Sequence, residues 1–107
     1  MRRRGVPRKL EYLAEAVTEA EAAARWYAER SPSAAERFSE ELDAAEVAIL
    51  EEPEAWPTFD QGTRRFLLRR FPFSVVYQVS EHQVLIVAVA HAHRRPLYWQ
   101  PRIHRPG

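Results

Sequence analysis

The sequence predicts an α+β fold, in which an N-terminal strand and an α-helical hairpin pack on a mainly antiparallel four-stranded sheet. Three observations lead to this prediction. Apolar residues between positions 18 and 53 recur at helical spacing, and a central proline divides them into two helices. Residues 64–91 contain three short segments rich in β-branched and aromatic residues. The helical part of the chain is acidic and the strand part is basic.

Length and composition indicate a single domain spanning residues 1–107. The sequence contains no cysteine, which excludes disulfides and thiolate metal sites and suits a cytoplasmic location. The longest apolar run, residues 84–90, is too short for a membrane span, and no secretion signal is recognisable, so no membrane association is expected. Residues 1–8 combine arginines with Gly5 and Pro7 and are expected to form a flexible basic arm.

The first part of the domain is predicted to contain a strand followed by a helix. Residues 9–14 alternate between apolar and polar side chains as a half-buried strand does. Thr18 and Glu21 form a capping box, so the helix is expected to begin there and to run to about residue 29. Its inner face would be formed by Ala20, Ala23, Ala24 and Tyr27.

A second helix is predicted after Pro32, since proline is tolerated in the first turn of a helix but not within one. Ser33 and Glu36 form a second capping box, and Pro53 is expected to end this helix. The apolar stripe that should face the core consists of Phe38, Leu42, Ala45 and Ile49.

The second half is predicted to form a three-stranded meander from residues 64–71, 74–79 and 84–91. The middle segment alternates, whereas the last is apolar throughout, as a strand covered on both faces would be. Before the meander, the irregular connection at residues 53–63 carries Trp56 and Phe59, which are expected to cap one end of the core.

Charge is strongly divided along the sequence. Residues 10–60 contain fourteen acidic and three basic side chains, whereas residues 61–107 contain one acidic and eight basic side chains. Such a partition favours a cationic surface that attracts polyanions or acidic partner segments. The alternative is that the acidic helices neutralise the basic sheet of the same molecule.

Two groups of short strings, in this order, resemble the RelE/ParE superfamily of type II toxins. The strings are RFPF at 70–73 with VY at 76–77 and Val79, and AVAH at 88–91 with RRP at 94–96 and YW at 98–99. Together with matching residues in the helical part, they cover about residues 10–102; these residues are Tyr27, Phe38, Leu42, Ile49 and Pro53. The strings are most similar to the ParE-like members described as plasmid stabilisation proteins.

The resemblance implies a toxin that is neutralised in a hetero-oligomer by a cognate antitoxin, whose amphipathic or acidic segment would cover a positive sheet and an apolar groove. ParE-like inhibition of DNA gyrase is the preferred activity, because the nuclease branch carries lysines in its central strands and this chain has only Lys9. The alternative implied by the superfamily is a RelE-like, ribosome-dependent endoribonuclease that cuts mRNA. A third hypothesis is a non-toxic module that binds nucleic acid or an acidic peptide.

Candidate site residues lie in the basic half. If the chain is a ribonuclease, it would be metal-independent, with His91 as base or acid, Arg94 and Arg95 on the phosphate, and Tyr98 stacking or donating a proton. The wider binding set is predicted to be Arg65, Arg69, Arg70, Arg94, Arg95 and Arg102, with Arg65 and Arg69 on a strand adjacent to that of His91. Each residue also has a structural alternative: a strand end for His91, core packing for Tyr98, and pairing with glutamates for the arginines.

No cofactor or metal ion is expected. His91, His93 and His104 lie near one another in the sequence, but no acidic residue accompanies them as a further ligand. The three glycines are too scattered to form a phosphate-binding loop.

Overall fold

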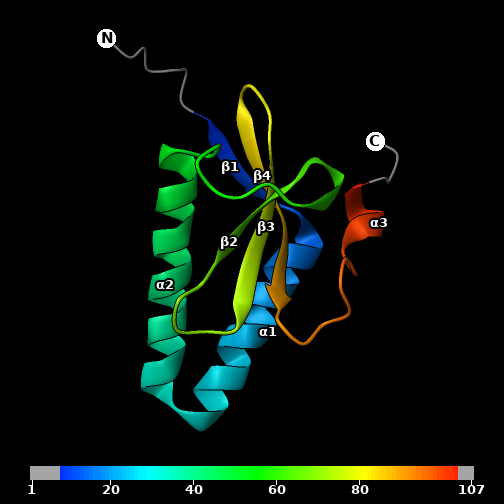
Figure 1. Cartoon of the computed structure of the whole chain (residues 1–107). Coiled ribbons are helices and arrows are strands. Elements are labelled where there is room, and N and C mark those ends of the chain that lie inside the picture. The colour runs from blue at the N-terminus through cyan, green and yellow to red at the C-terminus, as the bar shows by residue number, and fades with distance from the viewer. Residues whose placement is uncertain (1–7, 104–107) are drawn as a thin grey trace.

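The computed structural model describes residues 8–103, which form a helical hairpin packed on a four-stranded sheet (Figure 1). The elements are β1 (Lys9–Tyr12), α1 (Ala14–Arg30), α2 (Pro32–Glu51), the short 3₁₀ helix η1 (Asp60–Gly62), β2 (Arg64–Leu67), β3 (Phe73–Val79), β4 (Gln83–His91) and α3 (Gln100–Ile103). The strand order is β1-β4-β3-β2. β1 runs parallel to β4 and the other pairs are antiparallel, which confirms the predicted fold class and makes the sheet mixed.

The first helix begins four residues before the predicted capping box. β1 ends at Tyr12, and Leu13 caps α1 from an extended conformation without a side-chain hydrogen bond. Leu13 donates its N–H to the Ile86 carbonyl of β4, and its own carbonyl accepts the N–H groups of Ala16 and Val17. Ala16 is fully buried, so packing of the first turn against the sheet decides where the helix begins, and the Thr18 prediction is wrong.

The second helix confirms the predicted apolar stripe but not its cap. Phe38, Leu42, Ala45 and Ile49 are all buried. The N-cap residue is Ser31, whose side chain accepts the Ala34 N–H at 3.3 Å, and Pro32 occupies the first turn. The Ser33 capping box is therefore wrong, because the proline already starts the helix one residue earlier.

Apolar clusters lie on both faces of the sheet, and β4 contributes to both, as its sequence predicts. Ile86 and Val89 belong to the core beneath α1 and α2, whereas Val87 and Ala88 belong to the cluster on the opposite face. A register shift causes the change of face: Val76 pairs with Ala88 and Tyr77 pairs with Ile86, so Val87 is an extra residue in β4.

The connection between α2 and β2 differs from the prediction. Trp56 packs against the core under the helices and contacts Phe66, while Phe59 packs against Trp99 on the other face. The two aromatic residues therefore do not cap one end of a single core. The chain changes face between them through η1, in which Gln61 and Gly62 have positive φ angles of 63° and 73°.

β2 ends at Leu67 and not at residue 71. The chain turns away from the sheet there, and the backbone N–H groups of Arg69 and Arg70 donate to the Glu41 carboxylate of α2. A side chain of the helix thus replaces the ladder partners that a longer strand would need.

Most of the predicted basic arm, residues 1–7, lies outside the described residues. Arg8, its last residue, is anchored, because its Nε donates to the Ser80 carbonyl at 2.8 Å. Within residues 8–103 none of the helices combines the length and the apolar character needed to cross a bilayer.

Candidate functional site

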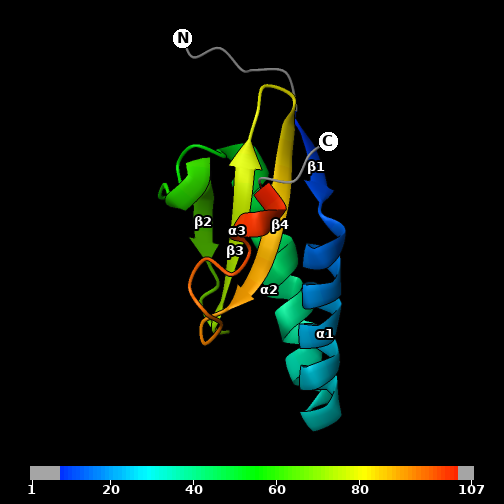
Figure 2. The same cartoon turned by 90° about the vertical axis from the view of Figure 1, so that its right-hand side faces the viewer.

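A cationic pocket lies on the face of the sheet opposite the helices, beside the segment that joins β4 to α3 (residues 92–99), which we call the tail loop. Figure 2 shows the tail loop and α3 on this face of the sheet. The pocket has a volume of about 190 Å³, and we call it the tail pocket. It is lined by Phe59, Arg65, Ser74, Val76, Ala90, His91, Ala92, Arg94, Arg95, Pro96, Leu97, Tyr98 and Trp99. Five sequence-predicted site residues are therefore brought together: Arg65, His91, Arg94, Arg95 and Tyr98.

Aromatic rings support two of the arginines. The guanidinium carbon of Arg94 lies 3.7 Å from the centroid of the Tyr98 ring, and that of Arg65 lies 4.2 Å from the centroid of the Phe59 ring. Stacking restrains the plane of a guanidinium and leaves the N–H groups at its edge available to an anion. Within residues 8–103 no carboxylate forms a salt bridge with Arg65, Arg94 or Arg95, so the tail pocket can accept phosphate or carboxylate groups.

Arg102 has a different role from the other predicted arginines. Its Nη2 lies 2.8 Å from Oε2 of Glu19 in α1, and the two side chains are each only 15% exposed. The pairing with a glutamate, which was the structural alternative from the sequence, is thus the one realised for Arg102. The hydrogen bond to Glu19 raises the pKa of Arg102, and this guanidinium is not open to a ligand.

Tyr98 is held by the same carboxylate. Its hydroxyl donates to Oε2 of Glu19 at 2.6 Å. Burial raises the pKa of Tyr98, and so do the hydrogen bond to Glu19 and its negative charge, although Arg102 and Arg94 oppose them. The phenol is therefore kept protonated, with its proton directed to Glu19 and not to the tail pocket.

His91 ends β4 at the margin of the tail pocket. Its ring is perpendicular to that of Phe73, at a centroid distance of 5.0 Å, and its Nδ1 accepts the backbone N–H of His93 at 3.0 Å. In the neutral ring this bond leaves the proton on Nε2. His91 thus has both a structural contact and one free nitrogen.

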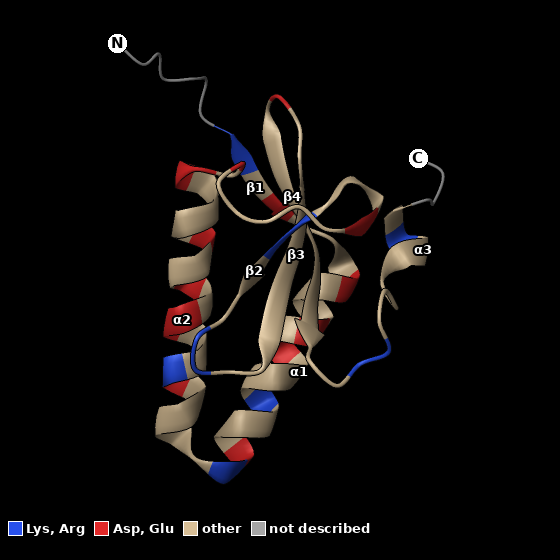
Figure 3. Cartoon of the chain, viewed as in Figure 1, with Lys and Arg blue, Asp and Glu red and all other residues tan. Residues whose placement is uncertain are grey.

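Arg69 and Arg70 are not part of this pocket. They lie in the turn after β2, next to α2, and not on a strand beside His91, because the Glu41 carboxylate holds their backbone there. Figure 3 shows this basic turn beside the acidic α2, and a separate basic segment in the tail before α3. The basic turn with Arg69 and Arg70 is therefore separate from the basic residues of the tail pocket, and together they do not form one continuous platform.

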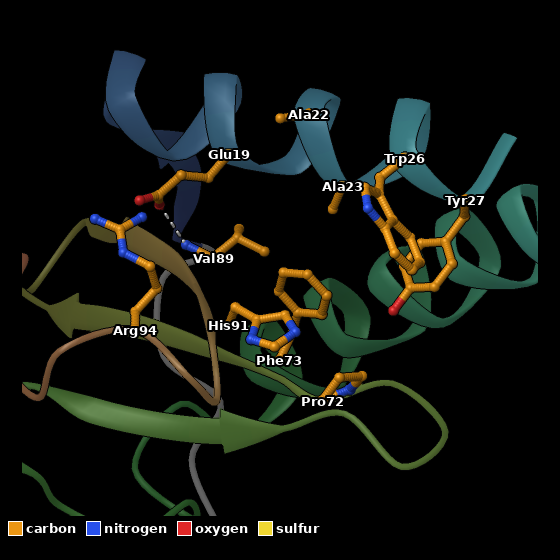
Figure 4. A pocket seen from close by; sticks show the side chains of 10 residues that line it. All are labelled: Glu19, Ala22, Ala23, Trp26, Tyr27, Pro72, Phe73, Val89, His91 and Arg94. Atoms are coloured by element: carbon orange, nitrogen blue, oxygen red, sulfur yellow. Dashed lines mark hydrogen bonds between the residues drawn. The ribbon is translucent and has the colours of Figure 1, made fainter. Parts of the chain in front are cut away.

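A second, larger cavity lies between α1 and the ends of β3 and β4 (Figure 4). It is an open groove of about 530 Å³, which we call the apolar groove. The residues that line it are Glu19, Ala22, Ala23, Trp26, Tyr27, Pro72, Phe73, Val89, His91 and Arg94.

Sequence reasoning expected a groove but did not identify its residues. The available signal was Trp26, which follows a run of alanines and is 51% exposed. An exposed tryptophan beside small side chains indicates a contact surface. His91 and Arg94 line both cavities, so they form the boundary between the apolar groove and the tail pocket.

Residues 8–103 contain no cluster of three or more histidine, aspartate or glutamate side chains that could hold a metal ion. His104, which lies near His91 and His93 in the sequence, is outside the described residues.

A comparison with known protein families identifies the family of this chain. The family model described as the ParE toxin of the type II toxin–antitoxin system parDE matches residues 10–96. The chain belongs to the ParE toxin family. This agrees with the resemblance seen in the sequence strings.

Solved structures support the fold of this ParE family member. It is similar to a chain of the chromosomal ParDE toxin–antitoxin system from P. aeruginosa, with a TM-score of 0.71 and 18% identity over 81% of this chain and 98% of the other. It is also similar to the isolated E. coli RelE toxin, with a TM-score of 0.51 and 21% identity over 87% of this chain and 93% of the other. No curated protein matches the sequence.

Proposed function

We propose that this toxin of a type II toxin–antitoxin pair acts by binding DNA gyrase through the tail pocket, and not by cutting mRNA. One observation carries the proposal: the Tyr98 hydroxyl is donated to Glu19, so the pocket offers cations without a free acid–base pair. The ParE-like resemblance of the sequence strings points to the same target.

Cleavage of RNA through its 2′-hydroxyl requires one group that accepts a proton and another that donates one. In the tail pocket, the Tyr98 hydroxyl already donates its hydrogen bond to Glu19, and arginine does not titrate near neutral pH. Among the predicted site residues, His91 is therefore the one that remains to carry a proton. A set of arginines around a single histidine is better suited to holding an anionic surface than to general acid–base catalysis.

Ribonuclease activity is the second candidate, because His91 shares a pocket with Arg94 and Arg95. In that reaction His91 would act on the 2′-hydroxyl and the arginines would stabilise the charged phosphorane. Among the predicted site residues that line the tail pocket, none would then remain as leaving-group acid, so that proton would have to come from another group, such as His93, whose ring centroid lies 5.1 Å from that of His91, or the ribosome.

The partner that neutralises the toxin is proposed to be its cognate antitoxin, bound in the apolar groove. A helix or extended segment with apolar side chains would fill the space beside Ala22, Ala23 and Trp26, and an acidic residue on it would meet Arg94 at the rim. Occupation of this groove would also cover His91 and Arg94, which the tail pocket shares.

Supercoiling of relaxed plasmid by purified gyrase tests the target. We expect the toxin to inhibit the reaction, the double substitution Arg94→Ala with Arg95→Ala to abolish most of the inhibition, and Arg25→Ala to leave it intact. Arg25 is a matched control, because it is an exposed arginine on α1 that lines neither cavity. Full supercoiling at saturating wild-type toxin would remove gyrase as the target.

Two measurements in cells separate the alternatives. Growth arrest on expression of the chain alone is expected for either toxin mechanism, whereas normal growth with abundant folded protein would favour the non-toxic binding module. Primer extension on transcripts after induction should show no codon-registered cuts. Cuts that disappear with His91→Ala would establish the ribonuclease in place of the gyrase mechanism.

A further inference from the structure

The edge of β4 beyond Ile86 has an unusual hydrogen-bond partner. β1 pairs with β4 only up to the Tyr12–Ile86 contact, so in the described part of the chain no strand covers that edge from Val87 to His91. Glu19 of α1 accepts the Val89 N–H at 3.0 Å, and Arg102 donates to the Val87 carbonyl at 2.9 Å. Two side chains therefore supply the backbone contacts that a further strand would otherwise make.

The Glu19 carboxylate joins four segments of the chain. Its Oε1 accepts from Val89 and from Nη1 of Arg102 at 3.1 Å, while its Oε2 accepts from the Tyr98 hydroxyl at 2.6 Å and from Nη2 of Arg102 at 2.8 Å. α1, β4, the tail loop and α3 thus meet at one side chain. Because this side chain is only 15% exposed, water competes weakly for these bonds.

Tyr98 connects this cluster with the tail pocket. The edge of its ring carries the hydroxyl bound by Glu19, and the face of the ring supports the guanidinium of Arg94 at 3.7 Å. The preceding residue, Leu97, has a φ of 59°, in the left-handed region that residues other than glycine rarely adopt. A loop in such a conformation depends on its tertiary contacts, and the bond between Tyr98 and Glu19 is one of them.

We infer that Glu19 is a positioning residue: by holding Tyr98, it orients Arg94 for an anionic group of the target, without touching that group itself. Glu19 lines the apolar groove but not the tail pocket, so its action on the pocket passes through Tyr98. That this orientation serves gyrase binding depends on the proposed function, whereas the orientation itself does not.

Nuclear magnetic resonance tests the orientation without any target. Side-chain protons of Arg94 lie over the Tyr98 ring and should be shifted upfield by its ring current. Glu19→Gln replaces one oxygen acceptor by an NH₂ group and is expected to remove this shift. Glu21→Gln is the matched control, because Glu21 is exposed on the same helix and the substitution removes the same negative charge. An unchanged Arg94 shift in the Glu19 variant would overturn the inference.

The supercoiling assay tests the consequence for binding. We expect Glu19→Gln to raise the half-inhibitory concentration about tenfold and Glu21→Gln to leave it within about twofold. If Glu19 acts through Arg94, adding Glu19→Gln to an Arg94→Ala toxin should change inhibition by less than about twofold, whereas a purely structural role would add its full effect. Full additivity would therefore overturn the inference.

Tyr98→Phe keeps the test valid if the Glu19 variant does not fold. This substitution retains the ring and removes only the hydroxyl bond to Glu19. A partial loss of the Arg94 ring-current shift is expected, and a wild-type shift would contradict the inference. If wild-type toxin does not inhibit gyrase, the proposed target is wrong, and the resonance experiment alone still decides the role of Glu19.

Discussion

Arg102→Ala should destabilise the protein strongly, because this arginine is paired inside the molecule. The change removes both contacts to Glu19 and the donor to the Val87 carbonyl, at a site where the two side chains are 15% exposed. Loss of one partner of a buried ion pair costs about 3–5 kcal/mol, and water that enters the vacated space should keep this case near the lower limit, at about 3 kcal/mol. For a domain of this size about 4 °C is lost per kcal/mol, so the melting temperature should fall by roughly 12 °C.

The assay is thermal unfolding followed by far-ultraviolet circular dichroism, with Arg95→Ala as the comparison. Arg95 is exposed and has no carboxylate partner in residues 8–103, so its removal should change the free energy of unfolding by less than about 0.5 kcal/mol. Equal melting temperatures for the two variants, within about 2 °C, would refute the structural role assigned to Arg102.

Three further predictions follow from other contacts. Burial raises the pKa of all four tyrosines above the ordinary value of 10.0, and that of Tyr77 to about 12. The free energy of unfolding, measured with denaturant, should therefore be at its full value below pH 10 and should fall progressively towards pH 12. Ionisation of tyrosine in the native protein at pH 10 would contradict this. Tyr77→Phe removes the donor to the Pro53 carbonyl at 2.6 Å and should cost about 1–2 kcal/mol, measured by the same unfolding, whereas no loss would show that this bond contributes nothing. Ala22→Arg, at an exposed position on the wall of the apolar groove, should weaken co-purification with the antitoxin but leave the melting temperature unchanged; undiminished co-purification would place the antitoxin elsewhere.

The parts of the fold that sequence predicted are those in which local pattern and packing agree. The stripe from Phe38 to Ile49 follows the helical period and is buried. The uninterrupted apolar run of β4 indicated correctly that apolar residues cover this strand on both faces of the sheet. The start of α1 was missed because a good capping box at Thr18 competes with the burial of Ala16, and burial decides.

The site was predictable only in part, for a similar reason. The strings around His91 and Arg94 are short and continuous, so their shared location could be read from the sequence. The link between Glu19 and Arg102 joins residues 83 positions apart, on segments that carry no pairing signal of their own. The same applies to Arg69 and Arg70, which Glu41 holds beside α2 through their backbone and not through their charge.

The affinity of the toxin for gyrase, measured at increasing salt concentration, tests the role of the tail pocket most directly. Binding is expected to weaken as salt screens the arginine contacts, and the variant with Arg94→Ala and Arg95→Ala should bind at least about tenfold more weakly, with a smaller dependence on salt. Binding that is indifferent to salt and equal in the wild type and the double variant, or no binding at all, would contradict the proposed mode of action.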